Sequence, residues 1–237
     1  MQSLVRVVVL TGLCASLLPV SVLVPMAVAQ DEPVYSGPQP GEAVAAFPLT
    51  GVFGDQADQN IDLVGQVGDG PLLLVFVHER TRPAFALCNA VMRFAAERRA
   101  QGLMAGMVFL SADPTETRTW LNNVSQHLPK DVAIGVSPDG LEGPGMLGLN
   151  RQVSVTVLVI RERRVSANFA LVQPSVNVDG PKILQAVVAV TGGGDVPDIS
   201  RYLAAGAMAA RGGRPAAGRP QPAEQDPNVR SLLTPLI

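Results

Sequence analysis

The chain has 237 residues, of which 47% are hydrophobic and 16% charged, and its formal net charge is -2. Such a length is sufficient for one ordinary hydrophobic core. The mildly acidic balance, without a basic stripe or a nucleic-acid-binding motif, argues against DNA or RNA as a partner.

Residues 1–29 have the pattern of an export signal, with a long apolar stretch that ends in a small-x-small cleavage site, Ala27-Val28-Ala29. The alternative is a membrane anchor, because about 18 or more apolar residues can span a bilayer. Two prolines within the stretch, Pro19 and Pro25, favour removal. We therefore expect an exported protein, periplasmic or secreted, that is cleaved after Ala29 and keeps no stable membrane anchor.

Composition divides the rest of the chain into three parts. Residues 30–41 are rich in Pro, Gly and Gln and are expected to form a linker. Residues 193–237 are dominated by Ala, Gly, Pro, Arg and Gln, cannot bury enough apolar surface, and are expected to form a disordered tail. Residues 42–192 remain as the folded domain. Cleavage would leave Cys88 as the one cysteine, so no internal disulfide is expected.

The folded domain is organised around residues 72–99. Six apolar residues, Leu72–Val77, predict a strand that is buried on both faces. After a polar turn, Pro83 stands where a helix accepts proline, in its first turn. Apolar residues then recur at helical spacing and predict an amphipathic helix: Phe85, Cys88, Val91, Met92 and Ala95.

The remaining elements follow in alternation. Apolar runs and turn signals predict a short hairpin or strand at 52–63, strands at 104–111, 132–136, 153–160 and 164–170, and helices at 115–128 and 179–190. Asp113 with Pro114, and Asp179 with Pro181, are expected to begin the two helices as cap and first-turn proline. The last two strands have a short link, so they are expected to pair as an antiparallel hairpin.

Residues 72–99 resemble the active-site strand, turn and helix of the thioredoxin-like superfamily, in which the turn reads Cys-Gly-Pro-Cys. Thr81-Arg82-Pro83-Ala84 falls on that motif: the proline matches, whereas Thr81 replaces the first cysteine and Ala84 the second. Peroxiredoxins, a branch of the superfamily, read Thr-x-x-Cys at this point, so that Thr81 matches and Ala84 replaces the peroxidatic cysteine. Pro40–Leu49 is also similar to the opening of many redoxin domains.

The resemblance covers roughly residues 40–192. It implies an α/β, thioredoxin-like fold of the redoxin or peroxiredoxin type (alkyl hydroperoxide reductase-like), with a central mixed sheet flanked by helices, and it implies that the usual cysteines are missing. A thioredoxin would carry a cis-proline at the position of Val155, and a cis bond without proline costs about 3 kcal/mol. A peroxiredoxin would carry an arginine at the position of Ser154, whereas this chain has Arg151 nearby.

Cys88 is the remaining candidate for thiol chemistry. Such chemistry needs an exposed thiolate in a field that lowers its pKa, for example at a helix N-terminus. Cys88 lies further into the predicted helix and shares a face with Phe85 and Met92, which points it inward. A buried cysteine in apolar surroundings is inert. We therefore expect a structural role for Cys88, with a redox role as the alternative.

The polar turn offers other candidates. His78 and Glu79 could suggest a metal or acid–base site, but a catalytic zinc site needs at least three protein ligands. The only other histidine, His127, lies at the end of a different predicted helix. We therefore expect a solvated turn at these positions, with no metal and no cofactor.

Arg80, Thr81 and Arg82 are the candidate ligand-binding residues. They stand at a helix start, where backbone N–H groups and the helix dipole favour anions. Two guanidinium groups beside those donors could hold a carboxylate by charge-assisted hydrogen bonds. The expected partner is accordingly an unknown protein or a small anionic ligand.

Two functions remain open. The first is an exported thioredoxin-fold protein that is redox-inactive and acts by binding a protein or a small ligand. The alternative is a redoxin-type oxidoreductase that carries out thiol–disulfide or peroxide chemistry with Cys88 or an external thiol. Thr81 and Ala84 at the nucleophile positions favour the first function.

Overall fold

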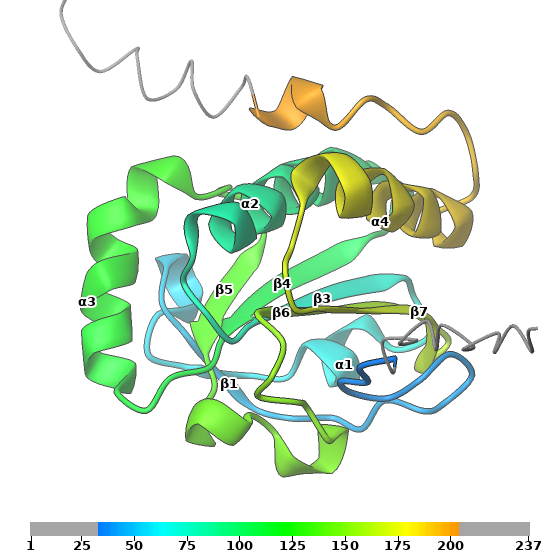
Figure 1. Cartoon of the computed structure of the whole chain (residues 1–237). Helices are drawn as coiled ribbons and strands as arrows, with labels where there is room; N and C mark the ends of the chain where they lie inside the picture. The colour runs from blue at the N-terminus through cyan, green and yellow to red at the C-terminus, as the bar shows by residue number, and fades with distance from the viewer. Residues whose placement is uncertain (1–32, 204–237) are drawn as a thin grey trace, which may run out of the picture. The chain divides into compact units, whose positions relative to one another are not determined.

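The computed structural model describes residues 33–203 (Figure 1). The predicted leader, residues 1–29, and the predicted tail beyond residue 203 lie outside this part of the chain. No helix in the described range is long and apolar enough to cross a membrane.

A seven-stranded mixed sheet forms the centre of the domain, in the order β2-β1-β5-β4-β3-β6-β7. Its strands are β1 (Leu49–Gly51), β2 (Asn60–Ile61), β3 (Leu72–Val77), β4 (Met104–Phe109), β5 (Ala133–Val136), β6 (Val155–Arg161) and β7 (Arg164–Leu171). The central strands β3, β4 and β5 are parallel. The neighbours on both sides run antiparallel: β1 to β5, β6 to β3, and β7 to β6, the last as the predicted hairpin.

The helices cover both faces of the sheet. They are α1 (Leu63–Val67), α2 (Arg82–Glu97), α3 (Pro114–Val124) and α4 (Val176–Val190). Figure 1 shows α2 and α4 side by side over one face, with α1 under the other. The mixed sheet between helical layers is the α/β, thioredoxin-like architecture that the sequence predicted.

β3 has the predicted bounds, and all six of its side chains are buried. Because side chains alternate across a strand, Leu73 and Val75 join the core beneath α2 and α4, whereas Leu74 and Phe76 join the core on the α1 face. Full burial of each such side chain stabilises the fold by about 1.5–3 kcal/mol. β3 is therefore held from both sides, and its end is a fixed point for the turn that follows.

The last helix begins earlier than predicted. Ser175, not Asp179, stands before its first residue, and Asp179 accepts a hydrogen bond from the Ser175 N–H at 2.7 Å. The Asp179 carboxylate, in the first turn of α4, thus satisfies the Ser175 N–H that stands before the helix. Pro181 then lies in the helix interior, where its missing N–H removes one backbone bond.

The region predicted as a hairpin at 52–63 also has different bounds. β1 begins before it, at Leu49, which pairs antiparallel with Ile61 of β2. The segment between the two strands contains a 3-10 turn, Gly54–Gln56, and leads through Asp62 into α1. The Asp62 side chain caps that short helix by accepting from the Gly65 N–H at 2.9 Å.

Ordered packing extends past both ends of the predicted domain, 42–192. Ser36, in the predicted linker, is only 1% exposed, and its hydroxyl is hydrogen-bonded to Thr156 Oγ1 at 2.6 Å. In the predicted tail, Ile199 and Tyr202 are 3% and 4% exposed. Composition describes a segment as a whole, so it does not reveal one or two side chains that fit a recess in the folded domain.

Candidate functional site

The turn between β3 and α2, residues 78–81, lies at the edge where the parallel strands β3, β4 and β5 end. Ligands of open α/β sheets gather at this edge. The fold brings Val155 here as well, because it begins β6 and pairs with Val77, the last residue of β3. The predicted turn residues and the predicted family-proline position therefore meet in one place.

Thr81 and Ala84 form the N-terminal cap of α2. Thr81 has extended backbone dihedrals, and its Oγ1 accepts a hydrogen bond from the Ala84 N–H at 3.3 Å. The Phe85 N–H donates to the Thr81 carbonyl at 2.9 Å, and Pro83 has no N–H. Of the donors at this helix start, the Thr81 and Arg82 N–H groups are those that these bonds leave for a ligand. Ala84 is fully buried.

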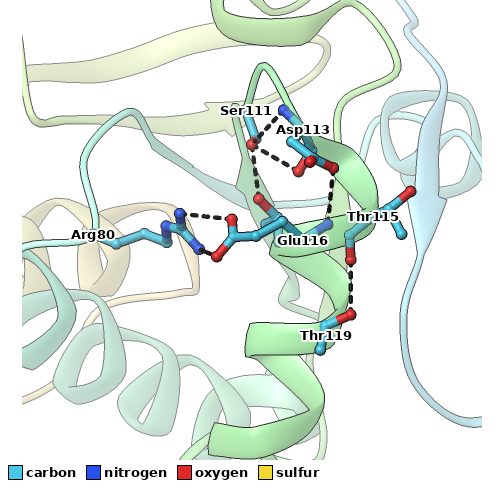
Figure 2. Close-up of polar contacts among 7 residues, drawn as sticks. Arg80, Ser111, Asp113, Thr115, Glu116 and Thr119 are labelled. Atoms are coloured by element: carbon cyan, nitrogen blue, oxygen red, sulfur yellow. Dashed lines mark hydrogen bonds and ion pairs between the residues drawn. The ribbon is translucent and has the colours of Figure 1, made fainter.

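Arg80 is held by an acidic side chain from another helix. Its guanidinium forms a two-pronged pair with Glu116 of α3, with Nη1–Oε1 at 3.2 Å and Nη2–Oε2 at 2.8 Å (Figure 2). The same guanidinium lies 5.2 Å from the ring centroid of Trp120. A cation over an indole face is attracted by the ring quadrupole. The Arg80 guanidinium is therefore already paired with a carboxylate of this chain, whereas Arg82 is exposed.

The start of α3 positions Glu116. Asp113 caps the helix as predicted, accepting from the Glu116 N–H at 2.9 Å, and Pro114 follows as its first residue. Ser111 Oγ accepts from the Asp113 N–H at 3.1 Å and donates to the Asp113 carbonyl oxygen, which fixes the loop before the cap (Figure 2). The Glu116 carboxylate is thereby directed toward the β3–α2 turn.

Neither Glu116 nor Trp120 was among the predicted site residues. Trp120 packs edge-to-face on Phe85 and Phe109, with centroids 5.6 Å and 5.8 Å away. The one available signal was their spacing of four residues, which places Glu116 and Trp120 on the same face of a helix. That spacing does not reveal that the face turns toward Arg80.

Glu79 and Ser154 tie the turn to β6. Ser154 Oγ lies 2.7 Å from Glu79 Oε2 and 2.8 Å from the Val172 carbonyl oxygen. The backbone N–H groups of His78 and Glu79 both donate to the Ser154 carbonyl, at 3.0 Å and 3.2 Å. Arg151, by contrast, pairs with Glu142 at the surface. Ser154 therefore has a structural role in shaping the turn.

His78 starts a chain of polar side chains that runs away from the surface. Its Nε2 is 3.0 Å from Thr156 Oγ1, which is hydrogen-bonded in turn to Ser36. The Nδ1 atom is buried and has no protein partner within residues 33–203. Burial lowers the pKa of His78 to about 4, although the nearby Glu79 acts in the opposite direction. His78 is consequently neutral near pH 7.

Cys88 lies inside the core, as predicted. It is 2% exposed and belongs to the cluster between α2, α4 and the sheet. Burial raises the pKa of its thiol to about 12. A thiol in this state supplies very little thiolate at neutral pH, and the thiolate is the reactive species.

Two further features of the site concern its backbone and its ligating groups. Residues 33–203 contain no cis peptide bond, so the bond before Val155 is trans. Within the same residues, no group of three or more His, Cys, Asp and Glu side chains is placed to hold a metal ion.

The chain was compared with known proteins by sequence and by structure. No protein-family model and no curated protein sequence matches the chain. Among solved structures, a Chlorobium tepidum protein assigned as a thiol:disulfide interchange protein, DsbE, superposes with a TM-score of 0.52 and 18% identity, over 65% of this chain and 99% of that one. A hypothetical protein from Sinorhizobium meliloti 1021 gives 0.51 and 20%, over 67% and 87%. A Bacteroides thetaiotaomicron protein assigned as a protein disulfide isomerase gives 0.50 and 12%, over 66% and 94%.

These identities are too low to transfer an activity, but the superpositions cover most of each neighbour. The chain therefore has a thioredoxin-like fold.

Proposed function

We propose that this is an exported, redox-inactive protein of thioredoxin-like fold that binds a carboxylate-bearing ligand at the β3–α2 turn. One observation carries the proposal: the turn holds no thiol, and its hydroxyl and buried methyl side chains, Thr81 and Ala84, complete a helix cap. The leader pattern of residues 1–29 supports export.

A redoxin-type oxidoreductase remains the second candidate, because two of the structural neighbours are assigned to thiol–disulfide chemistry. Within residues 33–203 such an activity would have to use Cys88, the one cysteine there. Its burial and raised pKa disfavour both access and ionisation.

The Arg80–Glu116 pair indicates the chemistry that the turn accepts. Glu116 already offers Arg80 a carboxylate in the two-pronged geometry that a guanidinium favours. Both side chains are partly exposed, 36% and 53%, and ion pairs of this kind contribute only about 0–1 kcal/mol. A carboxylate from solution can therefore exchange with Glu116, while Arg82 adds a second cation and a free N–H donor.

Binding at the turn can be measured through Trp120, the chain's single tryptophan. Its ring lies against Arg80, so replacement of Glu116 by a ligand should change its fluorescence. Citrate and an acidic peptide should both shift the amide resonances of Thr81–Phe85. Citrate represents a small ligand. If the peptide shifts these resonances at a much lower concentration than citrate does, the partner is a protein.

A matched pair of variants tests the assignment. Arg80→Ala with Arg82→Ala should abolish the response and leave the thermal midpoint nearly unchanged. Arg151→Ala removes another partly exposed arginine that pairs with a glutamate, and it should leave the response intact. No shift with either titrant would refute binding at this turn, and loss of folding in the double variant would show that the arginines have a structural role instead.

A further inference from the structure

A cleft of about 660 Å³ lies at the end of the sheet opposite the β3–α2 turn, where β4 and β5 begin. Its walls come from separate parts of the chain: the 3-10 turn Gly54–Gln56, α1, the 3-10 turn Arg98–Gln101 that follows α2, and the bend of residues 130–132 before β5. Ligand sites in proteins have volumes of roughly 300–1,000 Å³. The cleft is therefore large enough for a small ligand.

Apolar side chains make up much of the lining of this cleft. Leu103, Ala105 and Ile134 are buried, whereas Phe53 and Val132 are half-buried and still offer apolar surface. Removal of such surface from water is the main favourable contribution when a small molecule binds. The lining therefore favours a ligand with apolar side chains over a sugar or a free phosphate.

One side of β4 is unpaired at its start. β4 pairs with β3 from its first residue, Met104. Its pairing with β5 begins only at Gly106, opposite Ala133, because residues 130–132 bend instead of extending β5. In the part of the chain that the structure describes, Met104 and Ala105 thus have no strand beside them on that side, and both line the cleft.

The unpaired start of β4 indicates the kind of ligand. Backbone N–H and C=O groups need hydrogen-bond partners, and an open strand edge obtains them from an extended peptide that is added as a further strand. A strand rises about 3.3 Å per residue. A peptide of two or three residues is therefore long enough to lie beside Met104 and Ala105.

Charged side chains on the cleft walls match the ends of such a peptide. Arg99 and Asp131 pair with each other, with 3.8 Å between their nearest atoms. Asp55 and Lys130 also line the cleft, and neither forms an ion pair within residues 33–203. One carboxylate and one ammonium group are thus available for the ammonium and the carboxylate of a peptide with free termini.

We propose that the cleft binds a short apolar peptide, of two or three residues with free termini, as an added strand beside Met104 and Ala105. The peptide side chains contact Phe53 and Val132, its carboxylate pairs with Lys130, and its ammonium group pairs with Asp55. This site is separate from the β3–α2 turn, because it lies at the amino ends of the parallel strands and the turn lies at their carboxyl ends.

The test is a titration of leucyl-leucine into the chain without its predicted leader, residues 1–29. The dipeptide is added to about 10 mM, well above the sub-millimolar dissociation constant that a ligand of this size can reach. The amide resonances of Met104, Ala105 and Val132 should shift saturably, whereas those of Thr81–Phe85 should stay in place. Glycyl-glycine has the same termini without apolar side chains and should bind at least about tenfold more weakly.

Charge variants test the two termini. Lys130→Gln and Asp55→Asn should each raise the dissociation constant about two- to fivefold, the effect of one exposed ion pair. N-acetyl-leucyl-leucine lacks the ammonium group, so Asp55→Asn should not weaken its binding further. Lys182→Gln changes the chain's other lysine, which is exposed on α4, and should leave the dissociation constant unchanged. Absence of a saturable shift, equal binding of glycyl-glycine, or an unchanged dissociation constant in both charge variants overturns the proposal.

Discussion

Thr81 Oγ1 accepts a hydrogen bond from the backbone N–H of Ala84 at 3.3 Å. By the sequence resemblance, these two residues are predicted to stand where thioredoxins carry their two cysteines. In this chain the contact fixes the start of α2, and the adjoining Arg80 is paired with a carboxylate above Trp120. The turn is thus held in a fixed shape, and we propose that it binds an anion.

The cap should be measurable as stability. Thr81→Ala removes the acceptor for the Ala84 N–H and should lower the free energy of unfolding by about 0.5–2 kcal/mol, whereas Thr81→Ser keeps the hydroxyl and should cost much less. Urea denaturation at pH 7 measures both. Equal destabilisation by the two substitutions would mean that the methyl group of Thr81, not its hydroxyl, matters.

Cys88 should be protected in the native state. A maleimide should label it slowly in native buffer and quickly in denaturant, because its side chain is 2% exposed and burial raises the pKa of its thiol to about 12. Cys88→Ala should destabilise the domain only slightly, by about 1 kcal/mol, as a small cavity. Rapid labelling without denaturant would contradict this placement.

His78 should make stability depend on pH. Its pKa is lowered by burial from 6.5 to about 4 in the folded chain. Between those two values the unfolded chain binds a proton that the folded chain does not, so the free energy of unfolding should fall as the pH is lowered through this window. Above it, both states hold neutral histidine and the contribution is constant.

Urea denaturation of wild type and His78→Gln at several pH values isolates the contribution of His78 to the free energy of unfolding. The stability difference between them should change between pH 6.5 and about 4, the range set by the two pKa values. His127→Gln, at the other histidine, serves as the control for a general histidine effect. A difference that stays constant over the range would show that His78 is not responsible.

Glu116 should compete with ligand for Arg80. Glu116→Gln removes the internal carboxylate and should raise the affinity for citrate a few-fold, about the worth of a partly exposed ion pair. Glu142→Gln, which removes the partner of Arg151, should have no effect on affinity. Citrate titrations followed by Trp120 fluorescence compare them, and an unchanged or lower affinity in Glu116→Gln would contradict the exchange.

The central elements of the fold were predictable because each depends on residues that are close together in the sequence. A fully apolar run predicted β3, and an Asp-Pro pair predicted the start of α3. The start of α4 was predicted wrongly because an Asp close before a Pro can also lie inside a helix that has begun earlier. Asp179 is not the cap of α4; it lies in the first turn, and its carboxylate accepts from the Ser175 N–H.

The site was less predictable because its contacts join distant parts of the chain. Arg80 and Glu116 are 36 residues apart, and Ser36 and Thr156 are 120 apart. No periodicity in the sequence encodes either pair. The same limit applies to Ile199, whose recess at Gly180 exists only once α4 has packed.

The most direct test of the proposed redox inactivity is dithiothreitol-driven reduction of insulin by the chain without its predicted leader, residues 1–29. The wild type should remain at background, whereas Thr81→Cys with Ala84→Cys should exceed it, because that variant places one thiol at the N-cap and one in the first turn of α2, where the helix N-terminus lowers a thiol pKa. This gain would also show that the assay detects activity from the scaffold. A wild-type rate above background that disappears in Cys88→Ser would contradict the proposal and establish the oxidoreductase alternative.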